Sequence, residues 1–244
     1  MKDKVLRHHL FYFSPDALDN DLISFPPGES RHMVSSLRLR KGDRIRATDG
    51  RGVVYEVVLE EARRKQVTGR IADRTEVECP GARVTVFQGA VKPAKMALMI
   101  EKCVELGVWS VIPVETGLCV SGMGEGRVKR LKRIAIEAMK QSVGAHLPDI
   151  HSLTPFDGAL SRLSDFDLTV VAWEDEKHQR LKDIIGSERP GKVALWIGPE
   201  GGFTPVELDE LANHGARTFS LGDRRLKAET AAIASLAVLN ELLG

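Results

Sequence analysis

The most regular hydrophobic pattern in the chain lies near its C-terminus. A run of apolar residues that is introduced by Lys192 and ends at Ile197 predicts a buried strand. After a glycine-rich turn a helix pattern begins, in which Thr204 is a candidate N-cap, Pro205 suits the first helical position and Glu207 completes a capping box. The pattern predicts a strand, a tight turn and a helix in direct succession.

A second strand is expected soon after this helix. His214-Gly215 marks the helix end, and the segment from Arg217 to Leu221 is typical of a short strand that stops before Gly222. A third apolar strand, Asp167 to Trp173, precedes them in the chain. Because the carboxyl ends of parallel strands meet at one edge of a sheet and often form a ligand crevice there, these strand ends predict a small-molecule site.

Strand and helix signals alternate over the C-terminal two thirds of the chain. Beyond the segments above, the expected strands are Arg83 to Val91 and Val108 to Val114, and the expected helices are Lys92 to Gly107, Arg127 to Val143 and Glu229 to Leu243. Such alternation predicts an α/β domain, residues 83–244, with a mostly parallel sheet covered by helices on both faces. The last helix is apolar nearly all round, which predicts burial on more than one face and a homodimer contact.

The N-terminal quarter shows a different hydrophobic pattern. From Leu37 to Ile71 short apolar runs alternate with turn signals such as Asp49-Gly50, and Arg44 to Thr48 alternates apolar with polar positions. This pattern predicts a small all-β unit, a barrel, spanning residues 1–73. The polar stretch Asp73 to Ala82, which contains a Pro-Gly pair, is the expected linker.

The distribution of charged residues along the chain indicates a type of ligand, whereas the net charge does not. The 244 residues carry a net charge of +1, but the segment from Arg31 to Arg74 holds twelve Lys/Arg against six Asp/Glu. A local excess that is rich in arginine predicts contacts with an RNA backbone. The alternative, that these arginines are the solvated face of a half-polar sheet, stays open.

Several other chemistries are disfavoured. No G-x-G-x-x-G, P-loop or G-x-S-x-G motif occurs, and Glu200 inside the glycine turn would repel a pyrophosphate while tolerating a neutral or cationic ligand. The histidines are scattered and the three cysteines have no metal spacing, so no metal site is expected, and the thiols fit a reduced, cytoplasmic protein. Neither a secretion signal nor a membrane span is predicted. From the glycines alone, an ordinary strand-to-helix turn whose glycines serve only the backbone stays open beside the ligand site.

Three segments carry a family resemblance. IGPEGGFTPVELDEL followed by SLGDRRLKAETAAIASLAVLNELL resembles the C-terminal signature of the trefoil-knotted SPOUT methyltransferases. The match is best to the RsmE-like enzymes, which methylate N3 of a uridine in the 16S RNA of the small ribosomal subunit. KMALMIEKCVELGV is similar to a second pattern of that family, and SLRLRKGDRIRATDGRG resembles its PUA-like domain.

The resemblance implies a function and assigns residues to it. It implies S-adenosylmethionine as cofactor, a deep trefoil knot that forms the cofactor pocket, and ribosomal RNA or the small subunit as partner. Arg224 would stabilise the uracil anion, and Glu229 would position the cofactor or an arginine. Cofactor contacts are implied for Ala172, Trp173, Ile197, Gly198, Pro199, Glu200, Gly201, Gly202, Leu221, Gly222, Leu226 and Thr230. RNA contacts are implied for Arg31, Arg38, Arg40, Arg46 and Lys95.

The chain departs from the family pattern at three arginine positions. Leu118, Gly144 and Lys227 stand where family members carry arginine. Lysine keeps the charge but loses the planar two-pronged donor, and the other two residues lose the charge. These changes leave open an alternative in which the chain is an RNA-binding ribosome-assembly factor with the same fold and lost or altered catalysis.

Overall fold

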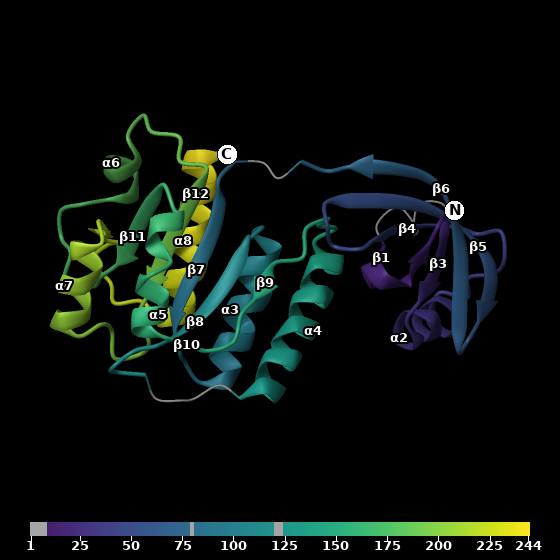
Figure 1. The fold of residues 1–244 in the computed structure, drawn as a ribbon, viewed down its shortest axis with the longest axis horizontal. Helices are drawn as coiled ribbons and strands as arrows, with labels where there is room; N and C mark the ends of the chain where they lie inside the picture. Colours follow the sequence, from purple (N-terminus) through teal and green to yellow (C-terminus); the bar gives the residue numbers. More distant parts are fainter. Residues whose placement is uncertain (1–8, 79–80, 120–123) are drawn as a thin grey trace. The chain divides into compact units, whose positions relative to one another are not determined.

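Residues 9–78, 81–119 and 124–244 are described by the computed structural model, and they belong to two units (Figure 1). The first unit consists of residues 1–79 and 136–147, and the second of residues 80–135 and 148–244. The sequence predicted a single boundary, with residues 1–73 before it and 83–244 after it. It did not indicate that the later segment 136–147 belongs with the N-terminal residues.

The first unit is built on a six-stranded sheet with the order β1-β4-β5-β6-β3-β2, in which only β1 and β4 run parallel. Its strands are β1 (Leu10–Tyr12), β2 (Leu18–Asp19), β3 (Leu22–Phe25), β4 (Arg44–Thr48), β5 (Val53–Arg63) and β6 (Gln66–Glu76). Its short helices are η1 (Pro15–Ala17), α2 (Pro27–Arg31) and η2 (His32–Ser36). The all-β prediction is confirmed, although within the described residues no pairing of β1 with β2 closes the sheet into the expected barrel.

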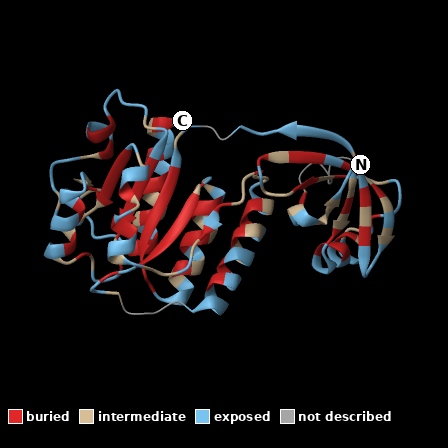
Figure 2. Ribbon diagram, viewed as in Figure 1, coloured by how far each residue is buried: buried red, intermediate tan, exposed pale blue. Residues whose placement is uncertain are grey.

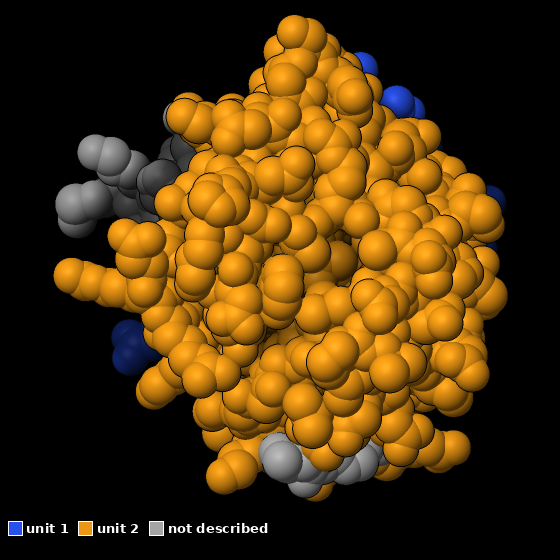
Figure 3. Space-filling model, turned by 90° about the vertical axis from the view of Figure 1, so that its left-hand side faces the viewer, with its two compact units in different colours: residues 1–79, 136–147 blue, residues 80–135, 148–244 orange. Residues whose placement is uncertain are grey.

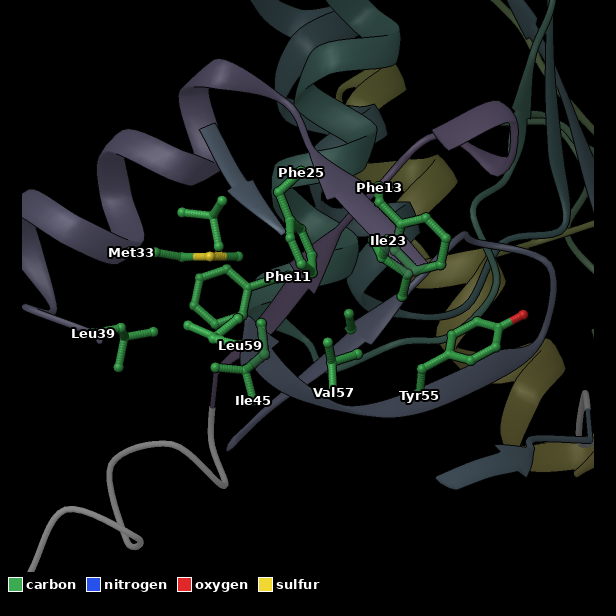
Figure 4. Packing of buried hydrophobic residues seen from close by; sticks show 12 residues of the cluster. Phe11, Phe13, Ile23, Phe25, Met33, Leu39, Ile45, Tyr55, Val57 and Leu59 are labelled. Atoms are coloured by element: carbon green, nitrogen blue, oxygen red, sulfur yellow. The ribbon is translucent and has the colours of Figure 1, made fainter. Parts of the chain in front are cut away.

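Alternation along the strands forms the core of this unit. On β4, Ile45 and Ala47 are buried, while Arg44 and Arg46 take the alternate positions. Figure 4 shows the apolar side chains converging, with Phe13 packed edge-on against Tyr55 at 5.5 Å between ring centroids. The arginines that the sequence analysis singled out on β4 are therefore kept out of the core by the pleat of the strand.

Residues 136–147 complete the first unit from the C-terminal part of α4 (Glu125–Gln141). The Lys140 ammonium donates to the Glu29 carboxylate, which is only 8% exposed. Burial raises the pKa of Glu29, and the pairing with Lys140 opposes that shift. Farther along, Thr48 Oγ1 donates to the carbonyl of Ala145 at 3.4 Å. These contacts join sequence-distant segments within one unit.

The second unit holds a seven-stranded sheet in which every pairing is parallel and the main order is β10-β8-β7-β12-β11-β13, with β9 paired to β8. The strands are β7 (Arg83–Gly89), β8 (Ser110–Glu115), β9 (Asp149–Ile150), β10 (Thr154–Pro155), β11 (Leu168–Ala172), β12 (Lys192–Ile197) and β13 (Arg217–Phe219). Figure 2 shows its central strands buried along their length, as expected for a sheet covered on both faces.

Helices lie on both faces of this sheet, which confirms the α/β prediction. They are α3 (Pro93–Glu105), α5 (Phe156–Leu160), α6 (Leu181–Ile185), α7 (Pro205–Asn213) and α8 (Ala228–Leu243), with the short η3 (Leu163–Asp165). One face is covered by α3 and α8, which also pack on each other. On the other face Trp196 stacks on Phe87 at 4.7 Å between centroids and clusters with residues of α5 and α7, such as Leu160 and Leu211.

The last helix buries one side only in the single chain. Ala232, Leu236 and Leu239 have no exposed surface, whereas Val238 is 40% exposed. The second apolar face that the sequence predicted for this helix is present, and within the described residues Val238 on that face is only partly covered.

The Lys140–Glu29 pair yields a first prediction. Lys140→Met should leave the buried Glu29 carboxylate without its cation and lower the free energy of unfolding by about 3–5 kcal/mol at pH 7. Because the pKa of Glu29 is already raised, protonation should relieve part of this penalty, so the loss should shrink as the pH falls toward 4. Urea denaturation at both pH values measures this change.

Glu137→Gln is the matched control. It removes a carboxylate 3.1 Å from the same ammonium, but one whose side chain is 64% exposed. An exposed pair contributes only about 0–1 kcal/mol. Equal effects of the two substitutions would contradict the burial argument.

Candidate functional site

A cavity of about 360 Å³ opens where β11, β12 and β13 end. Its walls come from the turns that follow these three strands and from the first turns of α3 and α8. The lining residues are Lys95, Ala172, Trp173, Glu174, Ile197, Gly198, Pro199, Glu200, Gly202, Phe203, Leu221, Gly222, Arg224, Arg225, Leu226, Lys227, Ala228 and Ala231. The second unit, orange in Figure 3, is visibly hollowed on the face shown there.

Ten of the twelve residues proposed to contact the cofactor line this cavity. The two exceptions are Gly201 and Thr230. A Cβ on Gly201 would meet the side chain of Leu118 at 3.0 Å, so this glycine faces out of the cavity, and Thr230 is exposed on α8. Arg224 is part of the lining, whereas Glu229 is buried beside it without forming the wall.

The glycine turn after β12 is held by the end of β7. The side chain of Gln88, fully buried, donates from Nε2 to the carbonyls of Gly89 at 3.0 Å and Gly198 at 3.2 Å. A Cβ on Gly89 would lie 2.5 Å from Cδ of Pro199, so only glycine permits this approach. No pattern in the sequence marks these two β7 residues, because the turn they support lies more than 100 positions away.

The far end of the same turn is fixed by the start of α7. Thr204 and Glu207 form the predicted capping box, with the Thr204 N–H donating to Glu207 Oε2 at 2.8 Å. The other oxygen of this carboxylate accepts from the Gly117 N–H at 2.8 Å. The cap therefore also anchors the loop that follows β8.

Three charged side chains meet at one side of the cavity. Lys95 Nζ lies 3.1 Å from a Glu200 oxygen and 4.0 Å from Oε2 of Glu229. Burial alone would raise the pKa of Glu200, but its own backbone N–H and the Lys95 ammonium outweigh burial and hold that pKa below its usual value. Oε2 of Glu229 is buried and accepts no hydrogen bond within the described part of the chain. Lys95, for which an RNA contact is expected, lies in the cavity lining.

Two acids in the loop after β11 make further contacts at and near the rim of the cavity. Glu174 lines the cavity and pairs with Arg225 at 2.7 Å. Glu176 accepts from two backbone N–H groups and from Thr218 Oγ1, and these bonds lower its pKa to about 2. Glu174 and Glu176 thus link the loop after β11 to β13 and to the segment that follows it.

Arg224 differs from its neighbour Arg225. It is exposed at the cavity, and among the residues that the structure describes no hydrogen bond or ion pair engages its guanidinium. A guanidinium without an internal partner is available to an external acceptor. Lys227, at one of the positions where the family has arginine, is the N-cap residue of α8 and also lines the cavity.

The arginines proposed to contact RNA all lie in the first unit. Arg31 ends α2, Arg38 and Arg40 are exposed between η2 and β4, and Arg46 is half-buried on β4 opposite Glu56. They are not part of the cavity lining. Within residues 9–78, 81–119 and 124–244 no cluster of His, Cys, Asp and Glu could hold a metal ion, and no helix is long and apolar enough to cross a membrane.

The Lys95 cluster yields a second prediction. Lys95→Met should lower stability by about 1–3 kcal/mol at pH 7, a value between those of exposed and buried pairs, because Glu200 and Glu229 would face each other without a cation. A carboxylate with a lowered pKa stabilises the fold above its ordinary pKa and loses this effect as the pH falls through the folded-state value. The difference from the natural chain in thermal unfolding should therefore narrow below about pH 4.

Lys102→Met on the same helix is the control, because Lys102 pairs with Glu101 and Glu105 in solvent. It should change the melting temperature little at either pH. A difference for Lys95→Met that does not depend on pH would contradict the assigned role of the two carboxylates.

The comparisons with known proteins agree with this geometry. The family description "RNA methyltransferase domain" matches residues 77–240, and "RNA methyltransferase PUA domain" matches residues 25–72. The chain is 29% identical over 223 residues to ribosomal RNA small subunit methyltransferase E of Bacillus subtilis, covering 87% of each chain. It is 27% identical to the Rickettsia conorii protein of the same name, covering 98% of this chain and 97% of that protein.

Among solved structures, it is similar to ribosomal RNA small subunit methyltransferase E of Neisseria gonorrhoeae bound to S-adenosylmethionine. The TM-score is 0.86 at 25% identity, with 97% of this chain and 98% of the other covered. Since the methyltransferase description alone covers more than half of the 244 residues, the chain belongs to the RNA methyltransferase family.

Proposed function

We propose that this protein uses S-adenosylmethionine to methylate N3 of a uridine in the 16S RNA of the small ribosomal subunit, in the cytoplasm. The observation that carries the proposal is the cavity at the carboxyl edge of β11, β12 and β13, whose turns are fixed by Gln88, Glu174 and the α7 cap. A cavity of this volume is in the range of small-molecule sites, about 300–1,000 Å³. Relatives in the same family are named as methyltransferases of that RNA, which favours catalysis over a binding-only assembly factor.

The lining is chemically suited to this cofactor. Ile197, Phe203 and Leu221 offer apolar contacts to an adenine ring, and the turns around Gly198 and Gly222 expose backbone groups for hydrogen bonds. The Lys95–Glu200 pair presents both signs of charge, as a zwitterionic amino-acid group requires. When bound, the cofactor would supply a methyl group on a sulfonium. The proposed contacts are the ten lining residues predicted from sequence, with Glu174 and Arg225 at the rim.

Arg224 is the proposed catalytic residue. The N3–H of uracil is a weak acid, and its conjugate base spreads negative charge over N3 and the two carbonyl oxygens. A guanidinium placed at a carbonyl oxygen stabilises that anion and so favours attack by N3 on an electrophilic methyl group. The lack of an internal partner for Arg224 supports this role. Glu229, buried 4.0 Å from Lys95, is proposed to position that lysine and to act through it.

The knot and the RNA contacts are further parts of the proposal. In support of a trefoil knot, β12 lies between β7 and β11, and α8 packs back on β7 and β12. The exposed arginines Arg31, Arg38 and Arg40 of the first unit are proposed to contact RNA phosphates. Of the three positions where the chain lacks a family arginine, only Lys227 lines the cavity among the described residues, and it retains a positive charge.

Two measurements test the proposed reaction. Calorimetric titration with S-adenosylmethionine should show one site per chain. Incubation with small subunits that lack the methyl group, followed by nucleoside mass spectrometry, should yield N3-methyluridine. Arg224→Gln should leave cofactor affinity nearly unchanged and slow methyl transfer by about 100-fold or more, the effect of losing one donor to a developing anion.

Arg225→Gln is the matched control. It breaks the pair with Glu174 at the rim and should weaken cofactor binding more than it slows transfer from bound cofactor. Absence of cofactor binding by the natural chain would overturn the enzymatic proposal. An unchanged rate for Arg224→Gln would overturn the role of that residue alone.

We further propose a homodimer formed through the second unit, with the exposed face of α8 in the interface. Val238 on α8 is 40% exposed, and Leu98 on the adjacent α3 is 45% exposed. Light scattering at micromolar concentration should give twice the chain mass, and Val238→Lys should shift the protein toward monomer. Val206→Lys, at a more exposed valine on α7, should not. A monomer in the natural chain, or equal effects of both variants, would contradict this interface.

A further inference from the structure

The N-terminal half of α4 carries a dense group of positive side chains that the proposed reaction does not use. Val128, Leu131 and Ala135 form the buried side of this half. The exposed side carries Lys129, Arg130, Lys132 and Arg133. We call the three residues Lys129, Arg130 and Arg133 the α4 basic face, because the helical repeat of 3.6 places them on one band of the surface.

This arrangement is unfavourable for the helix by itself. Lys129 is four residues before Arg133, and Arg130 is three residues before it, so both pairs bring like charges together on the helix surface. Within the described residues no carboxylate pairs with any of the three. The two acids of α4 do not neutralise the face, since Glu125 makes no ion pair with Lys129 and Glu137 binds Lys140.

Several exposed cations in other parts of the described chain have carboxylate partners. Arg70 pairs with Glu60 at 2.8 Å, Arg74 with Asp21 at 3.5 Å, and Lys102 with Glu105 at 2.8 Å. On the α4 basic face three neighbouring cations share a band of surface, and within the described residues none of them forms an ion pair, because Glu137, the nearest acid of α4 on the C-terminal side, binds Lys140. A bound polyanion would remove the mutual repulsion that the helix otherwise bears.

The composition of α4 indicates which polyanion. The helix contains no aromatic residue, so it offers no platform on which bases could stack. Two of the three cations are arginines, whose guanidinium groups match phosphate oxygens with two parallel hydrogen bonds. We propose that the α4 basic face binds the phosphate backbone of RNA without regard to sequence. The choice of RNA over an acidic protein rests on the proposed function.

The test is a triple substitution, Lys129→Gln, Arg130→Gln and Arg133→Gln, in the full chain. Its control is Lys182→Gln, Arg189→Gln and Lys192→Gln, which removes the same charge from exposed positions of the same unit. The probe is a fluorescently labelled single-stranded RNA of mixed sequence, titrated at several salt concentrations. Each phosphate contact on single strands contributes roughly 0.7 to the slope of log affinity against log salt, so the slope should fall by roughly 2 in the triple variant only.

At moderate salt the triple variant should bind this RNA about tenfold more weakly or worse, equally for a second RNA of different sequence. Its melting temperature should match or exceed that of the natural chain, because glutamine is a good helix former and the like-charge repulsion is gone. Cofactor affinity should not change. Such a result separates this surface from the cofactor site, since failure of the proposed reaction would appear in the cofactor titration of the natural chain.

Three results would overturn the inference. They are an unchanged salt slope in the triple variant, an equal loss in the control variant, or a loss confined to one RNA sequence. Unchanged RNA binding together with lost binding to a polyglutamate peptide would assign the face to an acidic protein instead.

Discussion

A single close approach, between Gly89 at the end of β7 and Pro199 in the turn after β12, determines the shape of the cavity. Parallel strands β7 and β12 are neighbours in the sheet, so the chain leaving β12 must pass directly over the end of β7. Any side chain at position 89 would occupy that path. The neighbouring Gln88 fixes the position of the turn, because its amide N–H donates a hydrogen bond to the carbonyl of Gly198. The rest of the site is assembled around a turn whose position is set by strand order.

The charged side chains around the cavity also depend on contacts between separate segments of the chain. The pKa of Glu200 is lowered because its own backbone N–H and the Lys95 ammonium outweigh burial, and Lys95 lies near two carboxylates supplied by different parts of the chain. Glu174, which also lines the cavity, joins the turn after β11 to the segment after β13 through Arg225. The Lys95–Glu200 and Arg225–Glu174 ion pairs each join two separate segments around the cavity. Such pairs help short irregular segments to keep a defined shape.

Local signals predicted local structure well. The bounds of β12 and the capping box of α7 agree with the sequence prediction to the residue, because an apolar run and a T-x-x-E pattern depend only on nearby positions. Where the backbone is redirected by distant partners the prediction was less accurate. The expected strand from Arg217 to Leu221 ends at Phe219, since the Ser220 N–H bonds to the carbonyl of Gln179 in a separate loop. Gln88 and Glu174 were missed for the same reason, because no periodicity marks a residue whose function depends on a contact with a remote turn.

The discontinuity of the first unit has a consequence for the order in which the protein can form during synthesis. The ribosome delivers residues 1–79 first, yet Lys140 and Ala145, which complete that unit, follow some sixty residues later. Until they emerge, Glu29 has no cation beside it and the Thr48 hydroxyl lacks its acceptor. The nascent N-terminal sheet therefore stays incompletely packed during the synthesis of β7, α3 and β8, which belong to the other unit. A stop or a cut anywhere in the linker would release an N-terminal fragment that lacks the cation beside Glu29, so the first unit cannot be completed without residues that follow part of the second unit in the chain.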